Sequence, residues 1–150
     1  MLLPVLSCSD DSDDPFCKSG SCSYEYYDNS QISVIAITMG GAYVEITAGD
    51  KQVFRRTYSY NDEPDIIDDE LNEILIFELD KDIDSFSLKD DELAQANVLF
   101  GRICYCLAGY RTVSSGTLEG EKISTGKWRI RANLHVNDAV GPLTFEAVYD

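Results

Sequence analysis

The segment Lys127-Trp128-Arg129-Ile130-Arg131-Ala132-Asn133-Leu134-His135-Val136 alternates strictly between polar and apolar side chains. Successive side chains of a β-strand point to opposite faces of its sheet. The apolar set therefore falls on one face: Trp128, Ile130, Ala132, Leu134 and Val136. This pattern predicts a strand with one buried face and one solvated face.

The rest of the chain carries further strand signals. Leu143–Tyr149 shows the same alternation, and Gly40-Gly41 predicts a tight hairpin between two strands. The other expected strands are Ile32–Thr38, Ala42–Thr47, Gln52–Tyr60, Glu73–Leu79, Ile83–Leu88, Arg111–Leu118 and Glu121–Ser124, the last two about a bend at Gly116 to Gly120. Eight or more short strands separated by turns predict an all-β fold, an antiparallel β-sandwich or barrel.

Two segments are open to a second interpretation. The acidic stretch from Asn61 to Asn72 fits a short helix opened by Pro64 or a plain loop. Residues 89–109 contain helix-favouring residues from Asp90 onward, but the β-branched and aromatic residues that follow favour a strand. We predict a strand from about Ala96 to Leu107, bulged at Gly101.

The bulk composition bounds the functional classes. A chain of 150 residues that is 44% hydrophobic is long enough for one domain with a core. The formal net charge of -15 repels nucleic acid and anionic lipid head groups, so neither is expected as a partner. No apolar run approaches the roughly 20 residues that a membrane-spanning helix needs.

The N-terminal residues predict a lipid attachment point. Apolar residues and the small Ser7 directly precede Cys8, and the run Asp10-Asp11-Ser12-Asp13-Asp14 follows it. We interpret residues 1–7 as the end of a signal peptide that starts further upstream, because no basic residue precedes the apolar part. The acidic run cannot bury itself and is expected to be a solvated, disordered tether. An ordinary apolar N-terminus is the alternative.

The expected organisation has three parts. Residues 1–7 are a partial signal peptide, residues 8–31 a lipidated acidic tether with a cysteine-containing lead-in, and residues 32–150 the β domain. The segment from Ser7 to Asp14 resembles the mature start of Bacteroidota lipoproteins, in which an acid-rich stretch follows the lipidated cysteine. That resemblance implies acylation of Cys8 and an outer-membrane location, at the cell surface or on the periplasmic face.

A second resemblance concerns Ile74 to Tyr149. The short motifs Ser115-Gly116-Thr117 and Ile123-Ser124-Thr125-Gly126 resemble sequence motifs of uncharacterised Bacteroidota lipoprotein domains with a β-rich fold. The matching residues are turn glycines and core positions. The resemblance therefore implies a fold and carries no activity across.

Four cysteines remain if Cys8 carries lipid: Cys17, Cys22, Cys104 and Cys106. Cys104 and Cys106 share one face of the predicted strand, which opposes a bond between them. The preferred hypothesis is that Cys17 and Cys22 cross-link to this strand, closing loops of roughly 80–90 residues worth at most ~4–5 kcal/mol. Local Cys17–Cys22 pairing with reduced Cys104 and Cys106 and a four-thiolate metal site are the alternatives.

Other candidate groups have simple structural explanations. His135 lies on the polar face of its strand, and Asp62 to Glu70 and Asp80 to Asp84 form acidic clusters without a calcium-binding loop. Tyrosines that flank strands are expected in the core or at its rim, although they also suit a platform for sugar or protein. These are Tyr24, Tyr26, Tyr27, Tyr58 and Tyr60.

The functional expectation is a lipid-anchored cell-envelope domain that binds or supports a ligand outside the membrane and needs no cofactor. No catalytic residue and no metal ligand is assigned. Two alternatives stay open. One is a carbohydrate-active hydrolase that uses a carboxylate pair, and the other a metal-handling domain that uses Cys104 and Cys106.

Overall fold

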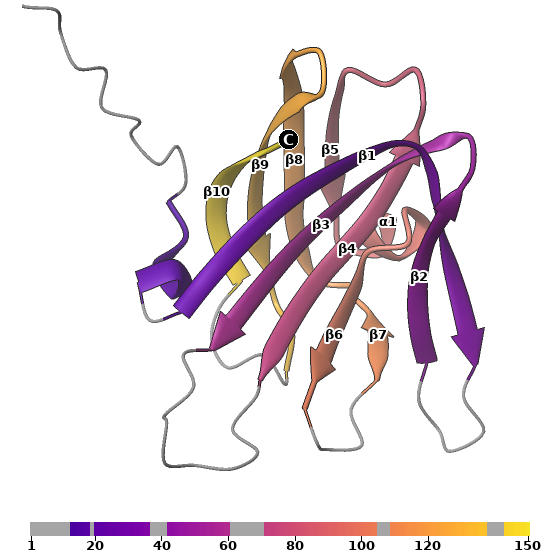
Figure 1. Cartoon of the computed structure of the whole chain (residues 1–150). Helices are drawn as coiled ribbons and strands as arrows, with labels where there is room; N and C mark the ends of the chain where they lie inside the picture. The colour runs from indigo at the N-terminus through magenta and orange to yellow at the C-terminus, as the bar shows by residue number, and fades with distance from the viewer. Residues whose placement is uncertain (1–12, 19, 37–41, 61–70, 105–108, 138–142) are drawn as a thin grey trace, which may run out of the picture.

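The computed structural model of the chain describes residues 13–18, 20–36, 42–60, 71–104, 109–137 and 143–150. These residues form ten strands, a 3₁₀ turn and one short helix (Figure 1). The 3₁₀ turn η1 is Pro15–Lys18 and the helix α1 is Asp91–Gln95. The strands are β1 (Gly20–Ala36), β2 (Ala42–Ala48), β3 (Lys51–Tyr60), β4 (Asn72–Asp80), β5 (Ser85–Lys89), β6 (Leu99–Ile103), β7 (Tyr110–Thr112), β8 (Gly116–Ser124), β9 (Lys127–Leu134) and β10 (Leu143–Tyr149).

The strands form two antiparallel sheets. One has six strands in the order β2-β1-β3-β4-β6-β7, and the other has four in the order β10-β9-β8-β5. The sheets meet at one corner, where the Tyr26 N–H donates to the Asp150 carbonyl (3.0 Å) and the Asp150 N–H to the Tyr24 carbonyl (3.4 Å). The predicted all-β fold is confirmed.

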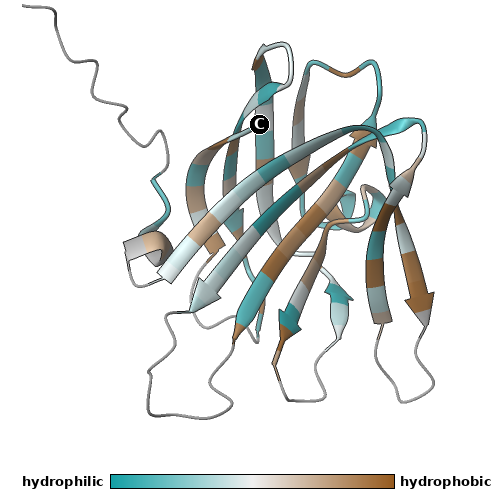
Figure 2. Ribbon diagram, viewed as in Figure 1, coloured by the Kyte–Doolittle hydropathy of each residue, from teal (hydrophilic) through white to brown (hydrophobic). Residues whose placement is uncertain are grey.

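The main core lies between the two sheets. Along β9 and β10 every second side chain is buried, as the alternation predicts. Phe54 and Phe77 stack with their ring centroids 4.8 Å apart, and the Trp128 ring meets Phe54 edge-on at 5.3 Å. Figure 2 shows the resulting bands of apolar and polar residues along the strands. Each such aromatic pair adds about 0.5–1.5 kcal/mol beyond the area it buries.

A second apolar cluster covers the other face of the six-stranded sheet. It is built around Val44, Val53, Ile76 and Leu99, with Ile32 and Ile46 packed against it. Because both faces of β3 and β4 are buried, these strands lack a simple alternation. The second half of β1 and all of β2 form the layer that covers this face.

β1 is much longer than predicted. It begins at Gly20 instead of Ile32 and pairs with β3 through Gly20 to Tyr27 and with β2 through Ser30 to Ala36. A register shift between Tyr27 and Ser30, with Asn29 at φ 49°, bends the strand between its two partners. The residues assigned to a lead-in therefore belong to the folded domain.

The prediction for residues 89–109 differs from the structure in three respects. A helical turn does form, at Asp91–Gln95, and the strand is only Leu99–Ile103. Gly101 pairs in register with Tyr110, without a bulge, and a Cβ on Gly101 would lie 2.6 Å from the Tyr110 ring. The glycine therefore makes room for an aromatic ring on the neighbouring strand.

Two turn predictions also differ from the structure. Gly116 to Gly120 is no bend, because β8 runs without interruption from Gly116 to Ser124. The hairpin between β1 and β2 is confirmed by its pairing, while Gly40-Gly41 itself lies outside the described residues, as does most of the ambiguous segment from Asn61 to Asn72. No helix among the described residues is long and apolar enough to cross a bilayer.

Tyr149 predicts a specific loss of stability at alkaline pH. Its side chain is fully buried, and its hydroxyl has no hydrogen-bond partner among the described residues. Burial raises the pKa of Tyr149 far above the ordinary value of about 10, an effect that the Arg56 charge only partly offsets. The contribution of this raised pKa to stability is complete below about pH 10 and is lost as the pH rises further, because only the unfolded phenol ionises.

At pH 7 we expect the free energy of unfolding of Tyr149→Phe to lie within about 1 kcal/mol of that of the parent, since the lost hydroxyl makes no hydrogen bond among the described residues. Above about pH 10 the variant should lose less stability than the parent. Urea unfolding at both pH values measures the difference. Tyr60→Phe is the control, because that side chain is 44% exposed. An equal alkaline loss in Tyr149→Phe and the parent would contradict the prediction.

Candidate functional site

The folded domain begins inside the acidic run. Asp13 forms an isolated antiparallel bridge with Glu146 of β10, and its N–H lies 2.7 Å from the Glu146 carbonyl. Asp14 follows, and η1 then leads into β1. The prediction that Asp10 to Asp14 is solvated throughout is therefore wrong at Asp14, whose side chain is fully buried.

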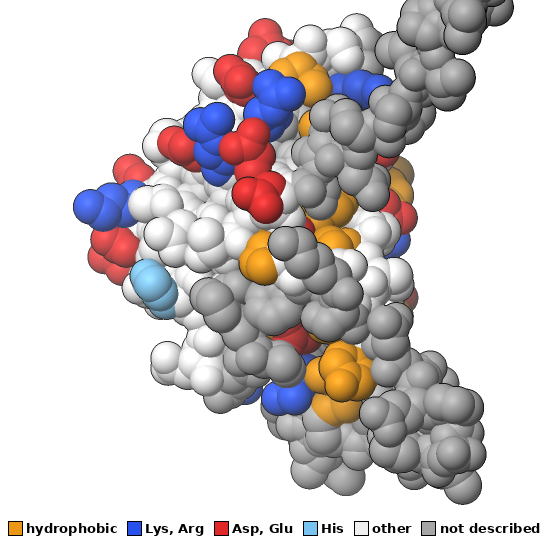
Figure 3. Space-filling view, turned by 90° about the vertical axis from the view of Figure 1, so that its left-hand side faces the viewer, with side chains coloured by type: hydrophobic (Ala, Val, Ile, Leu, Met, Phe, Trp, Pro, Cys, Tyr) orange, Lys and Arg blue, Asp and Glu red, His pale blue; other side chains and the backbone are white. Residues whose placement is uncertain are grey.

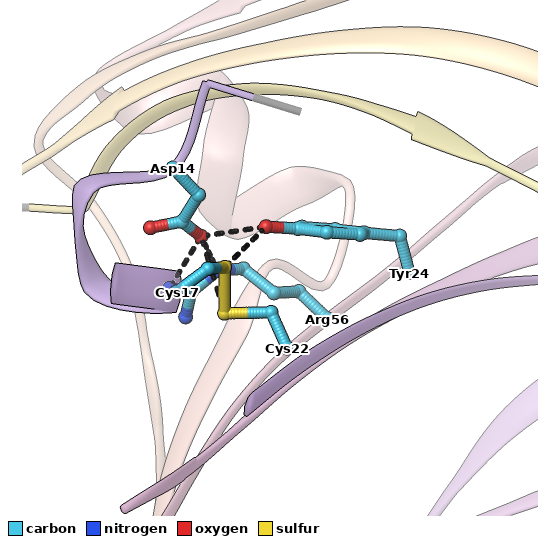
Figure 4. Close-up of a disulfide and its surroundings, with 5 residues drawn as sticks. All are labelled: Asp14, Cys17, Cys22, Tyr24 and Arg56. Atoms are coloured by element: carbon cyan, nitrogen blue, oxygen red, sulfur yellow. Dashed lines mark hydrogen bonds and ion pairs between the residues drawn. A yellow bond between two sulfur atoms is a disulfide. The ribbon is translucent and has the colours of Figure 1, made fainter. Parts of the chain in front are cut away.

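Asp14 is buried because it pairs with a buried arginine (Figure 4). Oδ2 of Asp14 lies 2.6 Å from both Nε and Nη2 of Arg56 on β3, and neither side chain is exposed to solvent. The Nε contact is a hydrogen bond and the Nη2 contact an ion pair, and the Tyr24 hydroxyl donates a further hydrogen bond to the same oxygen at 2.9 Å. A buried charge is tolerated only when it is paired and hydrogen-bonded, and these contacts meet that condition.

The surroundings keep Arg56 charged. Burial by itself would lower the pKa of Arg56, but the hydrogen bond to Asp14 and its negative charge outweigh that effect and the pKa is raised. The guanidinium carbon also lies 5.0 Å from the centre of the Phe145 ring and 5.9 Å from that of Tyr58. Aromatic faces at this distance attract a cation.

A disulfide links the start of β1 to η1. Cys17 and Cys22 are bonded, with Cα atoms 5.4 Å apart, and the Tyr24 hydroxyl lies 3.0 Å from Cys17 Sγ. The preferred hypothesis of cross-links from these cysteines to the strand around Cys104 is therefore wrong. In the loop-entropy model, so short a loop is worth only about 2 kcal/mol. We call Asp14, Cys17, Cys22, Tyr24 and Arg56 the N-terminal clasp.

Cys104 is disulfide-bonded as well. The alternative in which Cys104 stays reduced is thus also wrong. Cys17, Cys22 and Cys104 are therefore oxidised and offer no free thiolate to the alternative four-thiolate metal site, while Cys106 lies outside the described residues. Asp14, Cys17 and Cys22 bring three potential ligand atoms within 4.8 Å, but the two sulfurs are bonded to each other.

The structure accounts for several other predicted residues. Cys8, the expected lipidation site, and Cys106 lie outside the described residues, as do Asp62 to Glu70. His135 is exposed. Asp80 and Asp84 are exposed acids that pair separately with Lys51 (3.0 Å) and Lys122 (3.8 Å), so they do not converge on a common ligand position.

The predicted tyrosines do not form an exposed platform. Tyr58 is buried, Tyr24 and Tyr26 pack against the main core, and Tyr27 packs against the second apolar cluster. Only Tyr60 is well exposed. The expectation of core or rim positions is confirmed for the other four.

A group of carboxylates gathers on the outer face of the four-stranded sheet. Arg129 and Arg131 alternate with three acids there, and Figure 3 shows basic and acidic side chains next to each other on this side of the molecule. The acids are Glu119, Glu121 and Glu146, each within 4.0 Å of an arginine. On this surface each of the three carboxylates is thus paired with a neighbouring guanidinium.

Sequence reasoning missed Asp14 and Arg56, although one signal was available. Because successive side chains of a strand point to opposite faces, Arg56 lies on the same face as Phe54 and Tyr58. A charged residue among large aromatic neighbours requires a buried partner of opposite charge. Nothing in the local sequence identifies that partner as Asp14, which lies 42 positions away.

No protein-family model, curated protein or solved structure matches the chain. Its function must therefore be inferred from its own residues.

Proposed function

We propose that this chain is a lipid-anchored domain of the bacterial cell envelope that binds or supports a ligand and has no catalytic centre. Cys8 carries the acyl chains, and the acidic residues after it form a short tether. The domain is held at the outer membrane, at the cell surface or on its periplasmic face. The resemblance of the segment from Ser7 to Asp14 to Bacteroidota lipoproteins supports this location.

The observation that carries the proposal is the N-terminal clasp. Asp14 ends the acidic run and is bound inside the domain by Arg56 and Tyr24. A fully extended chain from residue 8 to residue 13 spans less than about 20 Å, because each residue adds at most ~3.6 Å. A lipid at Cys8 would therefore hold the domain close to the membrane surface, through a segment whose far end is firmly attached.

The disulfide supports export. Bonds such as Cys17–Cys22 form and persist in oxidising compartments, which include the periplasm and the cell surface, and are rare in the cytosol. The net charge of -15 opposes adsorption to anionic lipids, so a covalent anchor supplies the attachment that the protein surface does not.

Metabolic labelling tests the anchor. Bacteria that produce the chain from its complete coding sequence are given an azide-bearing fatty acid, and the protein is isolated from membrane and soluble fractions. We expect label on the parent in the membrane fraction, and neither label nor membrane retention for Cys8→Ala. Asp10→Ala with Asp11→Ala is the matched control, since it alters the tether and leaves the lipidated cysteine intact. An unlabelled parent, or equal labelling of Cys8→Ala, would refute the proposal.

A further inference from the structure

In the layer formed by the second half of β1 and by β2, β2 pairs with β1 along one edge and with no other strand in the part of the chain that the structure describes. Val44 and Ile46 of β2 face Ile76 and Val53 in the second apolar cluster. The Ile32 N–H of β1 donates to Glu78 Oε2 at 2.9 Å, which fastens the β1 side of this layer to β4. β2 is the terminal strand of the six-stranded sheet and approaches β7, the strand at the sheet's opposite end (Figure 1).

An open hollow of about 700 Å³ lies along β2. All six residues from Tyr43 to Ala48 line it. Consecutive residues of a strand point to opposite faces, so a hollow lined by every one of them follows the edge of the strand, where backbone N–H and C=O groups are presented. Its size lies within the range of ligand-binding clefts.

The opposite wall offers aromatic and apolar surface. It is formed by Tyr27, Arg55, Ile76 and Tyr110. Arg55 donates to Glu25 Oε2 and to the Tyr27 hydroxyl, each at 2.7 Å, and the Tyr27 hydroxyl donates to Glu25 Oε1 at 2.9 Å. The hydrogen bond to Arg55 lowers the pKa of Glu25, so this acid stays ionised and compensates the arginine. The wall therefore presents no uncompensated positive charge to a ligand.

The sequence of β2 carries few of the features that oppose strand pairing. Natural edge strands carry lysines, prolines or bulges. β2 contains none of these, and Glu45 is its only charged residue. Residues 29–44 carry no charge at all in a chain of net charge -15. In the same layer Val34 is 56% exposed and Tyr43 48%.

We propose that the hollow binds an extended peptide segment of another protein, which pairs with the edge of β2 as an added strand. Backbone hydrogen bonds to β2 would supply affinity, and alternate apolar side chains of the peptide would pack on Tyr27 and Tyr110, which are only partly buried. The partner segment is neutral or basic, because Glu45 and the overall charge repel acidic chains. Two copies of this chain would repel each other for the same reason, which favours a foreign segment over self-pairing. The site does not depend on a lipid at Cys8.

A synthetic peptide tests the site. The probe is a fluorescein-labelled peptide in which valine alternates with lysine or threonine, titrated with the full chain and followed by fluorescence anisotropy. Its partner probe has the same sequence with the central amides N-methylated, which removes the donors needed for strand pairing. We expect the methylated peptide to bind at least ~10-fold more weakly, a difference that corresponds to about 1.4 kcal/mol.

Two variants locate the binding. Tyr43→Ala should weaken binding several-fold, whereas Tyr60→Ala, which removes a tyrosine of similar exposure outside the hollow, should leave it unchanged. Hydrogen exchange should show peptide-dependent protection of the backbone amides of β2. Protection confined to other strands would overturn the proposal, as would equal binding of both peptides or no binding of either. If the chain forms a dimer without peptide, and the β2 amides are protected from exchange in that dimer, the proposal would be overturned and the occupant of the hollow would be a second copy of the chain.

Discussion

Asp14→Ala is expected to lower the free energy of unfolding by about 3–5 kcal/mol, because it leaves the buried charge of Arg56 without its carboxylate. The hydrogen bond from the Tyr24 hydroxyl to Asp14 is lost at the same time. The loss of stability arises mainly from the buried guanidinium charge that no longer faces a carboxylate. It therefore exceeds the contribution of an ordinary hydrogen bond, which is about 1 kcal/mol. Urea unfolding of the purified, disulfide-intact domain measures the change.

The neighbouring arginine provides the control. Arg55 pairs with Glu25 at 2.7 Å, close to the distance between Arg56 and Asp14, but their side chains are 34% and 37% exposed. Glu25→Ala should therefore cost no more than about 1 kcal/mol, because water replaces the lost carboxylate. Equal losses in the two variants would show that burial does not set the strength of the clasp.

Gly116→Ala is expected to cost about 2–5 kcal/mol through a steric and conformational conflict. Gly116 has φ 113°, and an added Cβ would lie 2.2 Å from the Asn133 carbonyl oxygen and 2.8 Å from the Leu134 Cα. Both atoms belong to the backbone of β9, so β8 would have to move away from its partner. Such a movement would also disturb the hydrogen bond that the Gly116 N–H donates to Asp90 Oδ1 at 3.0 Å.

Gly126→Ala separates the two contributions. Gly126 has φ 74°, but nothing lies within 4 Å of its Cβ position. Its replacement should cost only the conformational strain, about 1–2 kcal/mol. Thermal unfolding of both variants gives the comparison. A loss in Gly116→Ala no larger than in Gly126→Ala would contradict the steric explanation.

The clasp and the hollow beside β2 belong to different parts of the six-stranded sheet. The clasp joins the first half of β1 to β3, and the hollow lies along the layer formed by the second half of β1 and β2. A covalent anchor at one part would leave the other accessible. The two proposed roles, attachment and peptide binding, are thus compatible on one small domain.

Strands with one buried face were predicted accurately. β9 and β10 follow the alternation closely, because water on one side and the core on the other make every second position apolar. The region around α1 was predicted less accurately. A single helical turn is stable only through its tertiary contacts, here the packing of its one buried residue, Leu93, in the main core. β1 was only half recognised, since its tyrosines and polar residues resemble a loop until they are packed.

The sequence by itself determined the all-β class, the buried faces of β9 and β10, and the acidic run after Cys8, because these follow from local composition and a two-residue period. Only the tertiary structure decided that Cys17 pairs with Cys22 and that Asp14, at the end of the acidic run, is buried against Arg56. It also decided between Arg55 and Arg56, two adjacent arginines on opposite faces of β3. Both faces of that strand are covered, and although Arg56 shares a face with Phe54 and Tyr58, local sequence does not show that this face is the more deeply buried one. The distinction depends on where β10 and the N-terminal segment pack.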